Sequence, residues 1–202
     1  MSAPRVVLAS ASPRRSDMLR LLGIEHERCE ARVEEAVLSG EAPEDHVLRL
    51  ARAKAAAVAA RHPGALVIGG DTVVTLGERI LGKPTGPDDA VAMLLELAGR
   101  RHSVFTGVAV AGPAGVLASV GRADVVLRDF DAAEARAYVA TGEPDDKAGG
   151  YGIQGRGAAL VERISGDYYT VVGLPVVPLL DLMARQGWRY RFDRFEPVET
   201  GK

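Results

Sequence analysis

The sequence has little of what a secreted or membrane protein would contain. Its 202 residues include one cysteine, Cys29, so no disulfide can form within the chain and a reducing cytosol is the expected compartment. No apolar run approaches the length of a membrane span, and the apolar stretch Val6–Ala9 is too short for the hydrophobic region of a signal peptide. We therefore expect a soluble, cytoplasmic protein with no membrane partner.

Neither sign of charge dominates the chain. Lys and Arg number 25 against 27 Asp and Glu, which gives a net charge of −2. Broad contact with a phosphate backbone usually needs a clear basic excess, so no nucleic-acid partner is expected, although a small anion needs only a few placed cations. Hydrophobic residues make up 47% of the chain, enough for a real core. We predict one domain over residues 1–202, with a core at about 5–186 and a charged tail at 187–202.

Apolar runs and turn residues alternate early in the chain in the manner of an α/β protein. Strands are predicted at residues 5–9, 65–68, 73–75, 79–81, 103–111, 116–128 and 158–164. Helices are predicted at residues 13–22, 43–62, 87–97, 131–141 and 176–186, most of them marked by Pro or a capping residue at the start or by Gly at the end. Because two long strands meander in the middle, the predicted class is α/β with a mixed sheet.

The segment Ser10–Arg15 follows the first predicted strand and opens the first predicted helix. A helix N-terminus offers unpaired N–H groups and positive potential to an anion, and Ser10, Ser12, Arg14 and Arg15 would add to it. Taken alone, the segment is more simply a helix cap followed by two solvated arginines.

Asp71 is expected just past the carboxyl end of the strand at 65–68, after Gly69 and Gly70, where open α/β sheets place ligands. A single Asp at such a place is more often a turn residue or a cap. Lys54 lies on an apolar helix face, from which it could extend to water or contact phosphate as a point charge.

The segment Gly142–Gly155 is unusually rich in glycine and also carries Tyr151, Ile153 and Gln154. Loops of this length are usually functional or disordered, and the apolar residues favour function.

Five segments of the chain resemble, in order, the successive motifs of the Maf family. They are Ser10–Arg15, Gly70–Val74, Gly82-Lys83-Pro84, Gly142–Gly155 and Val171–Pro175. Each is a weak signal alone, but five in order are highly specific, and the resemblance runs from about Arg5 to Arg185. Ala11 and Gly150 stand where Gly and Ala are common in the family, and both remain small.

The resemblance implies a Maf/Ham1 (ITPase-like) α/β fold: an elongated mixed β-sheet flanked by helices, with two lobes around a central cleft. It also implies a nucleoside triphosphate pyrophosphatase that needs a divalent metal cation, Mg²⁺ or Mn²⁺, and belongs to the branch that acts on dTTP and UTP. A homodimer is a family-level expectation.

The resemblance also implies a role for particular residues. Asp71 matches the catalytic acidic residue, and Glu35 matches the other acidic residue of the cleft, so that both are expected metal ligands. The positions expected to bind phosphate are Ser10, Arg15, Lys54 and Lys83. The positions expected to set substrate specificity are Arg14, Thr72 and Gln154.

The implied reaction is attack of water on the α-phosphorus, with pyrophosphate leaving. Asp71 would act as general base or as a metal ligand that positions the water, and the sequence leaves both roles open. The side-chain amide of Gln154 can pair with the N3–H donor and O4 acceptor of thymine or uracil, although a flipped amide would match cytosine.

Two alternatives remain beside this interpretation. The same reaction could act on 7-methyl-GTP or another base. The chain could instead be a nucleotide-binding regulator of septation without turnover, which the presence of Glu35, Asp71 and Lys83 disfavours.

Overall fold

The computed structural model describes residues 3–192 and 194–198, and the chain divides into two compact units. Unit 1 comprises residues 1–71, 106–121 and 173–202, and unit 2 comprises residues 72–105 and 122–172. A seven-stranded sheet has the order β2-β1-β3-β5-β6-β7, with β4 paired to β3. The sheet contains parallel and antiparallel pairs and is flanked by helices, which confirms the predicted mixed α/β class.

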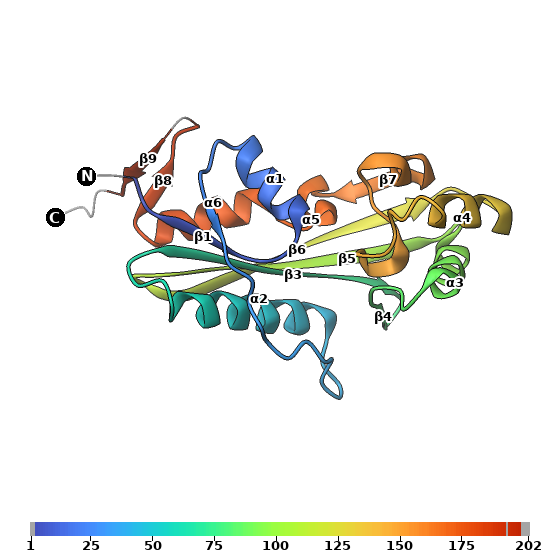
Figure 1. Ribbon diagram of the computed structural model, residues 1–202, viewed down its shortest axis with the longest axis horizontal. Helices are drawn as coiled ribbons and strands as arrows, with labels where there is room; N and C mark the ends of the chain where they lie inside the picture. Colours follow the sequence, from blue (N-terminus) through green and yellow to red (C-terminus); the bar gives the residue numbers. More distant parts are fainter. Residues whose placement is uncertain (1–2, 193, 199–202) are drawn as a thin grey trace. The chain divides into compact units, whose positions relative to one another are not determined.

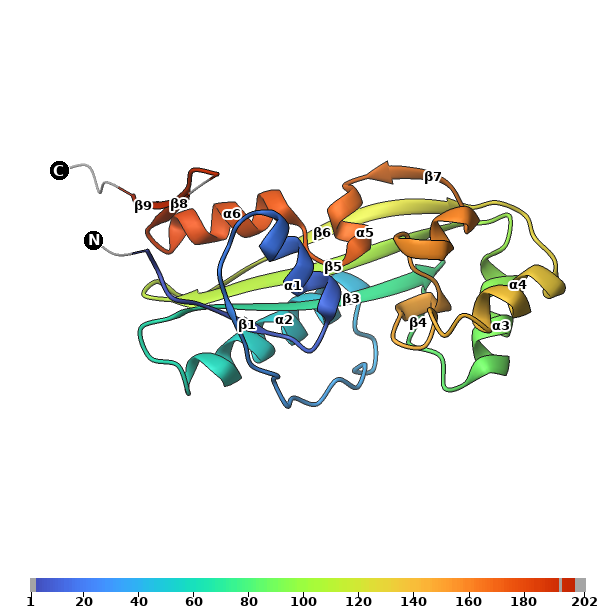
Figure 2. The ribbon, with the colours of Figure 1, turned by 45° about the horizontal axis from the view of Figure 1, so that its top comes forward.

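The first strands of unit 1 are parallel, and helices cover both of their faces. The strands are β1 (Val6–Ala9), β2 (Glu27–Arg28), β3 (Leu66–Leu76), β5 (Arg101–Gly112) and β6 (Gly115–Leu127), and β1 pairs in parallel with β2 and β3. The helices are α1 (Pro13–Leu21), α2 (Pro43–Ala59) and α6 (Val176–Arg185). Helix α2 lies on one face of β1 and β3, and helices α1 and α6 lie on the other (Figure 1), as the turned view also shows (Figure 2).

Helix α2 packs unusually close to the sheet because small residues face each other across the contact. Its buried face includes Ala51 and Ala55. A Cβ atom built on Gly69 would lie 2.3 Å from the carbonyl oxygen of Ala51, and one on Gly107 would lie 2.2 Å from that of Val47. These distances leave no room for a side chain. Glycine is therefore required at both positions by the backbone of α2.

Strand β3 is longer than the sequence predicts. The predicted strand ends at residue 68, with Gly69, Gly70 and Asp71 following in a loop, whereas β3 continues without a break through all three residues to Leu76. The prediction that Asp71 follows a strand end was therefore wrong. The glycines serve the packing of both sheet faces, since a Cβ on Gly70 would lie 3.0 Å from Nε of Arg15, on the face opposite α2.

Unit 2 has its own hydrophobic core, which includes Leu94, Leu97 and Leu127. Its elements besides parts of β3, β5 and β6 are β4 (Arg79–Leu81), α3 (Pro87–Leu97), α4 (Ala132–Val139), the 3₁₀ helices η1 (Ala148–Gly150) and η2 (Gly155–Leu160), β7 (Val161–Gly166) and α5 (Tyr168–Val172). Asp131 caps α4 as predicted, since its carboxylate accepts from the amides of Ala133 and Glu134.

Three details of the prediction differ from the structure. The predicted strand at 158–164 begins at Val161, because the preceding residues belong to η2. The sequence does not predict α5. The residues of the expected tail form a second sheet of β8 (Trp188–Tyr190) and β9 (Phe195–Pro197), which their charged composition conceals. The hydroxyl of Tyr190 donates to the carbonyl of Leu22 at 2.6 Å, so this sheet is tied to the end of α1.

None of the helices within residues 3–192 and 194–198 combines the length and the hydropathy that a transmembrane segment needs.

We predict that Gly107→Ala lowers the free energy of unfolding by about 1–3 kcal/mol, because the added methyl group must displace the backbone of α2. Chemical denaturation measures the change. Gly82→Ala is the matched control, since its Cβ would meet nothing within 4 Å, and it should change stability by less than about 0.5 kcal/mol. Equal losses in the two variants would show that the approach of α2 does not constrain residue 107.

Candidate functional site

The centre of the candidate site is a buried ion pair between α2 and β3. Side chains alternate between the two faces of a strand, so Asp71 lies on the same face as Gly69, toward α2. Lys54 Nζ donates to Asp71 Oδ1 at 2.7 Å. Lys54 is 8% exposed and Asp71 is 9% exposed. Lys54 therefore does not extend into water, as many lysines on apolar faces do, because a carboxylate lies within its reach inside the unit.

A second carboxylate shares the same ammonium group. Glu35 Oε1 lies 2.6 Å from Lys54 Nζ, although the Glu35 side chain is 55% exposed. Glu35 belongs to an irregular segment that precedes α2. One lysine thus holds two carboxylates that are far apart in sequence, and the structure brings together three of the predicted site residues.

The segment that carries Glu35 is fastened to α2 through Glu41. The carboxylate of Glu41 accepts from Arg49 Nε at 2.5 Å and Nη2 at 2.8 Å, and His46 Nδ1 lies 2.9 Å from it. Arg49 Nη2 also donates to the carbonyl of Ala36, the residue after Glu35, at 2.9 Å. The hydrogen bonds from Arg49 hold the pKa of Glu41 well below its usual range. Sequence reasoning missed this cluster, because an acid beside a helix start carries no distinctive pattern.

Arg15 and Ser10 lie where the first strand gives way to α1. Arg15 Nη1 donates to Ser10 Oγ at 3.0 Å, and Arg15 Nε donates to the carbonyl of Gly173 at 2.8 Å. The first and the fifth motif segments are therefore in contact. Burial lowers the pKa of Arg15, while the charges of Asp71 and Glu35 act in the opposite direction. Arg15 is thus a half-buried cation held by Ser10 and Gly173, and not a solvated arginine.

The N-terminus of α1 is arranged differently from the prediction in one respect. Ser12 occupies the N-cap position, but its side chain makes no capping hydrogen bond. Its backbone amide instead donates to Ser10 Oγ at 3.2 Å. Arg14, at the second position of the helix, is half-buried. The helix start consequently presents backbone amides beside two arginines, which suits an anion.

Asp71 and Glu35 could together hold a metal ion. Mg²⁺ is commonly bound by one or two carboxylates together with substrate phosphates. The two side chains fit that donor set, because their carboxylates lie close enough together to contact one cationic group, the Lys54 ammonium. No group of three or more His, Cys, Asp or Glu side chains that could hold a metal occurs in the described part of the chain.

The remaining predicted residues belong to unit 2. Thr72 follows Asp71 on β3 and is half-buried, whereas Lys83 and Gln154 are exposed. The amide of Gly149 donates to the carbonyl of Gly82 at 2.9 Å, so the third and fourth motif segments touch beside Lys83.

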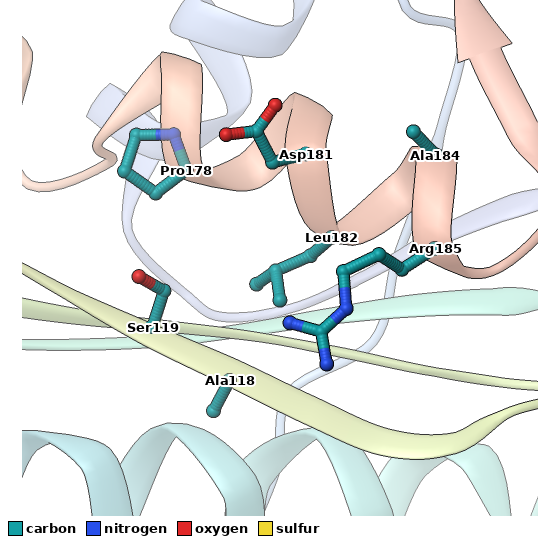
Figure 3. A pocket seen from close by; sticks show the side chains of 7 residues that line it. All are labelled: Ala118, Ser119, Pro178, Asp181, Leu182, Ala184 and Arg185. Atoms are coloured by element: carbon teal, nitrogen blue, oxygen red, sulfur yellow. The ribbon is translucent and has the colours of Figure 1, made fainter.

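Unit 1 also has an open groove between α6 and β6, with a volume of about 530 Å³ (Figure 3). It is lined by Ala118, Ser119, Pro178, Asp181, Leu182, Ala184 and Arg185. None of the predicted site residues lines it, and its one Asp and one Arg show no arrangement specific to a reaction.

Comparison with known proteins identifies the family that the chain resembles. Residues 5–186 match the family model of Maf-like proteins. The dTTP/UTP pyrophosphatase of Aquifex aeolicus is 49% identical over 179 residues, covering 89% of this chain and 94% of that protein. The dTTP/UTP pyrophosphatase of Moorella thermoacetica is 50% identical over 184 residues, covering 89% and 94%.

One solved structure shares a weaker likeness. The Ham1 protein of Staphylococcus aureus has a TM-score of 0.44 and 18% identity, covering 62% of this chain and 72% of that chain, which is too low to support an argument. The fold and the charged cluster define an α/β protein with a Lys–carboxylate cluster between α2 and β3. On the match to the family model and the identity to these relatives, the chain belongs to the Maf family.

We predict that the two carboxylates couple unequally to Lys54. In double-mutant cycles of unfolding free energy, Lys54→Met with Asp71→Asn should give a coupling of about 1–3 kcal/mol, because removing one partner leaves a charge buried. The cycle with Glu35→Gln should give less than about 1 kcal/mol. The contacts are equally short, but the Asp71 side chain is 13% exposed and the Glu35 side chain 55%. Equal couplings would contradict the assignment of Asp71 as the buried partner.

Proposed function

We propose that this chain is a nucleotide pyrophosphatase that hydrolyses dTTP and UTP to the monophosphate and pyrophosphate. The observation that carries the proposal is the buried pair of Lys54 and Asp71 at 2.7 Å, with Glu35 on the same lysine. The names of relatives that are 49% and 50% identical over almost their whole length support the choice of substrate.

The chemistry follows from charge and position. Asp71 accepts the proton of the water that attacks the α-phosphorus, and the bond from that phosphorus to the pyrophosphate oxygen breaks. Lys54 contacts Asp71 and, with Arg15 and the amides at the start of α1, neutralises phosphate charge. A divalent metal cation bound by Asp71 and Glu35, Mg²⁺ or Mn²⁺, would supply further neutralisation and acidify water.

The proposal assigns further residues to the phosphates and to the base of the substrate. Ser10 and Lys83 bind phosphate, and Lys83 is exposed to solvent. Arg14, Thr72 and Gln154 select the base. Gln154 is exposed, and its side chain makes no hydrogen bond within residues 3–192 and 194–198. Its amide is therefore available to pair with N3–H and O4 of thymine or uracil.

The experiment that tests the proposal is release of pyrophosphate from a panel of nucleoside triphosphates with Mg²⁺ or Mn²⁺. The panel should include dTTP, UTP, CTP and 7-methyl-GTP, and turnover should be fastest with dTTP and UTP. Asp71→Asn should lower kcat on the order of a hundredfold or more, because the amide keeps the volume and loses the proton acceptor.

The matched control is Asp88→Asn on the exposed start of α3, which should leave kcat unchanged. Preference for 7-methyl-GTP would move the assignment to another base. Nucleotide binding without release of pyrophosphate would favour a regulator. If the Asp71→Asn variant keeps most of its kcat, Glu35 becomes the better candidate for the proton acceptor.

A second prediction concerns the base. Gln154→Glu should lower kcat/KM for dTTP and UTP by roughly tenfold to a hundredfold, because it sets an anionic oxygen against O4 where a donor had been. The same change should favour bases with two donors or a positive charge at that edge. The measurement is kcat/KM for the four nucleotides in both proteins. An unchanged ranking would mean that Gln154 does not contact the base.

A further inference from the structure

The loop that presents Gln154 is held by the half-buried carboxylate of Glu143. Glu143 Oε1 accepts from the amide of Gly157 at 3.1 Å, and Glu143 Oε2 accepts from the amide of Arg156 at 2.9 Å. These amides lie two and three residues after Gln154. Burial raises the pKa of Glu143, but the two amides, Tyr138 and Lys147 together keep it below its usual value. Glu143 is therefore anionic and suited to accept several hydrogen bonds at once.

Tyr138 extends the same contact to the other side of Gln154. The ring is buried on α4, and its hydroxyl donates to Glu143 Oε1 at 3.2 Å. The same hydroxyl accepts from the amide of Gly152 at 3.0 Å, two residues before Gln154. One pair of side chains thus holds the backbone on both sides of the residue that is proposed to read the base.

Two glycines, Gly155 and Gly157, lie against the same pair. A Cβ on Gly157 would lie 2.5 Å from the Tyr138 hydroxyl and 2.2 Å from the carbonyl of Gly152. Gly155 has a φ of +67°, and its Cβ would lie 3.0 Å from both carboxylate oxygens of Glu143. The absence of a side chain at residues 155 and 157 therefore leaves the space that Glu143 and Tyr138 occupy.

We infer that Glu143 and Tyr138 are positioning residues that fix the backbone on both sides of Gln154 and thereby set which base the protein accepts. The inference rests on the proposed function, in which Gln154 contacts the base. The Gln154 side chain is exposed, whereas Tyr138 is buried and Glu143 is half-buried. Pairing of an amide with two edge atoms of a base depends on direction as well as distance, so a shift of the loop changes selectivity before it changes phosphate binding.

The test uses Glu143→Gln and Tyr138→Phe in the full chain. Each should lower the ratio of kcat/KM for dTTP to that for CTP by about tenfold, because at least one backbone amide loses its acceptor. The loss should appear mainly in KM for dTTP. The inhibition constant of inorganic pyrophosphate, which has no base, should stay unchanged. Tyr138→Phe removes only a hydroxyl from a packed ring, so its fold is retained.

The matched controls make the same chemical changes on exposed residues of unit 2. Glu162→Gln lies on β7 and Tyr168→Phe lies on α5, and neither should alter the ratio. Equal losses for dTTP, CTP and pyrophosphate in Glu143→Gln would show a merely structural role and overturn the inference.

A double-mutant cycle asks whether Glu143 acts through Gln154. In a Gln154→Ala background, Glu143→Gln should leave the dTTP to CTP ratio unchanged, because the base-reading amide is already absent. The same tenfold loss in that background would overturn the inference. If the unsubstituted chain prefers a nucleotide other than dTTP or UTP, the proposed function fails, and the cycle is run on the preferred nucleotide and its nearest competitor. The inference would still be supported if Glu143→Gln lowers that preference in the unsubstituted chain but does not lower it further in the Gln154→Ala background.

Discussion

The contact between the backbone of α2 and the sheet determines the arrangement of unit 1. Gly69 and Gly107 meet the carbonyls of α2 at distances that leave no room for a Cβ atom. This contact constrains the rotation of α2, because the face that lies against the strands carries Ala51 and Ala55. Lys54 projects from that face, and its ammonium therefore reaches Asp71 two residues beyond Gly69. The ion pair is thus a consequence of packing between small residues.

Three successive residues of β3 face alternate sides of the sheet. Gly69 and Asp71 face α2, whereas Gly70 faces Arg15 on the other side of the sheet. An uninterrupted strand is what allows this arrangement, since a loop after residue 68 would not keep the side chains on alternate faces. Arg15 in turn contacts Ser10 and the carbonyl of Gly173, so segments from the beginning and the end of the sequence are joined at the same place.

Local sequence patterns predicted most of the helices and strands. The contacts among the site residues join segments that are far apart in sequence, and local patterns do not predict them. The helices at 87–97 and after Asp131 follow from apolar spacing and capping residues, and the structure has both. The break expected after residue 68 failed because glycine is read as a turn signal, although here it makes room for α2 and Arg15. The sequence indicated Asp71, Glu35 and Lys54 as separate residues through a family resemblance. Their shared contact, and the fastening of Glu35 by Glu41 and Arg49, depend on packing that no local pattern records.

The residues that hold the loop and Gln154 itself differ in how freely they can be substituted. Glu143, Tyr138, Gly152 and Gly157 are joined by hydrogen bonds, so a change at any of them disturbs the rest. The side chain at position 154 is exposed and takes no part in these hydrogen bonds. Substitution at position 154 should therefore cost little stability, and on the proposed role of Gln154 the base preference could change at this one position while the surrounding scaffold is kept.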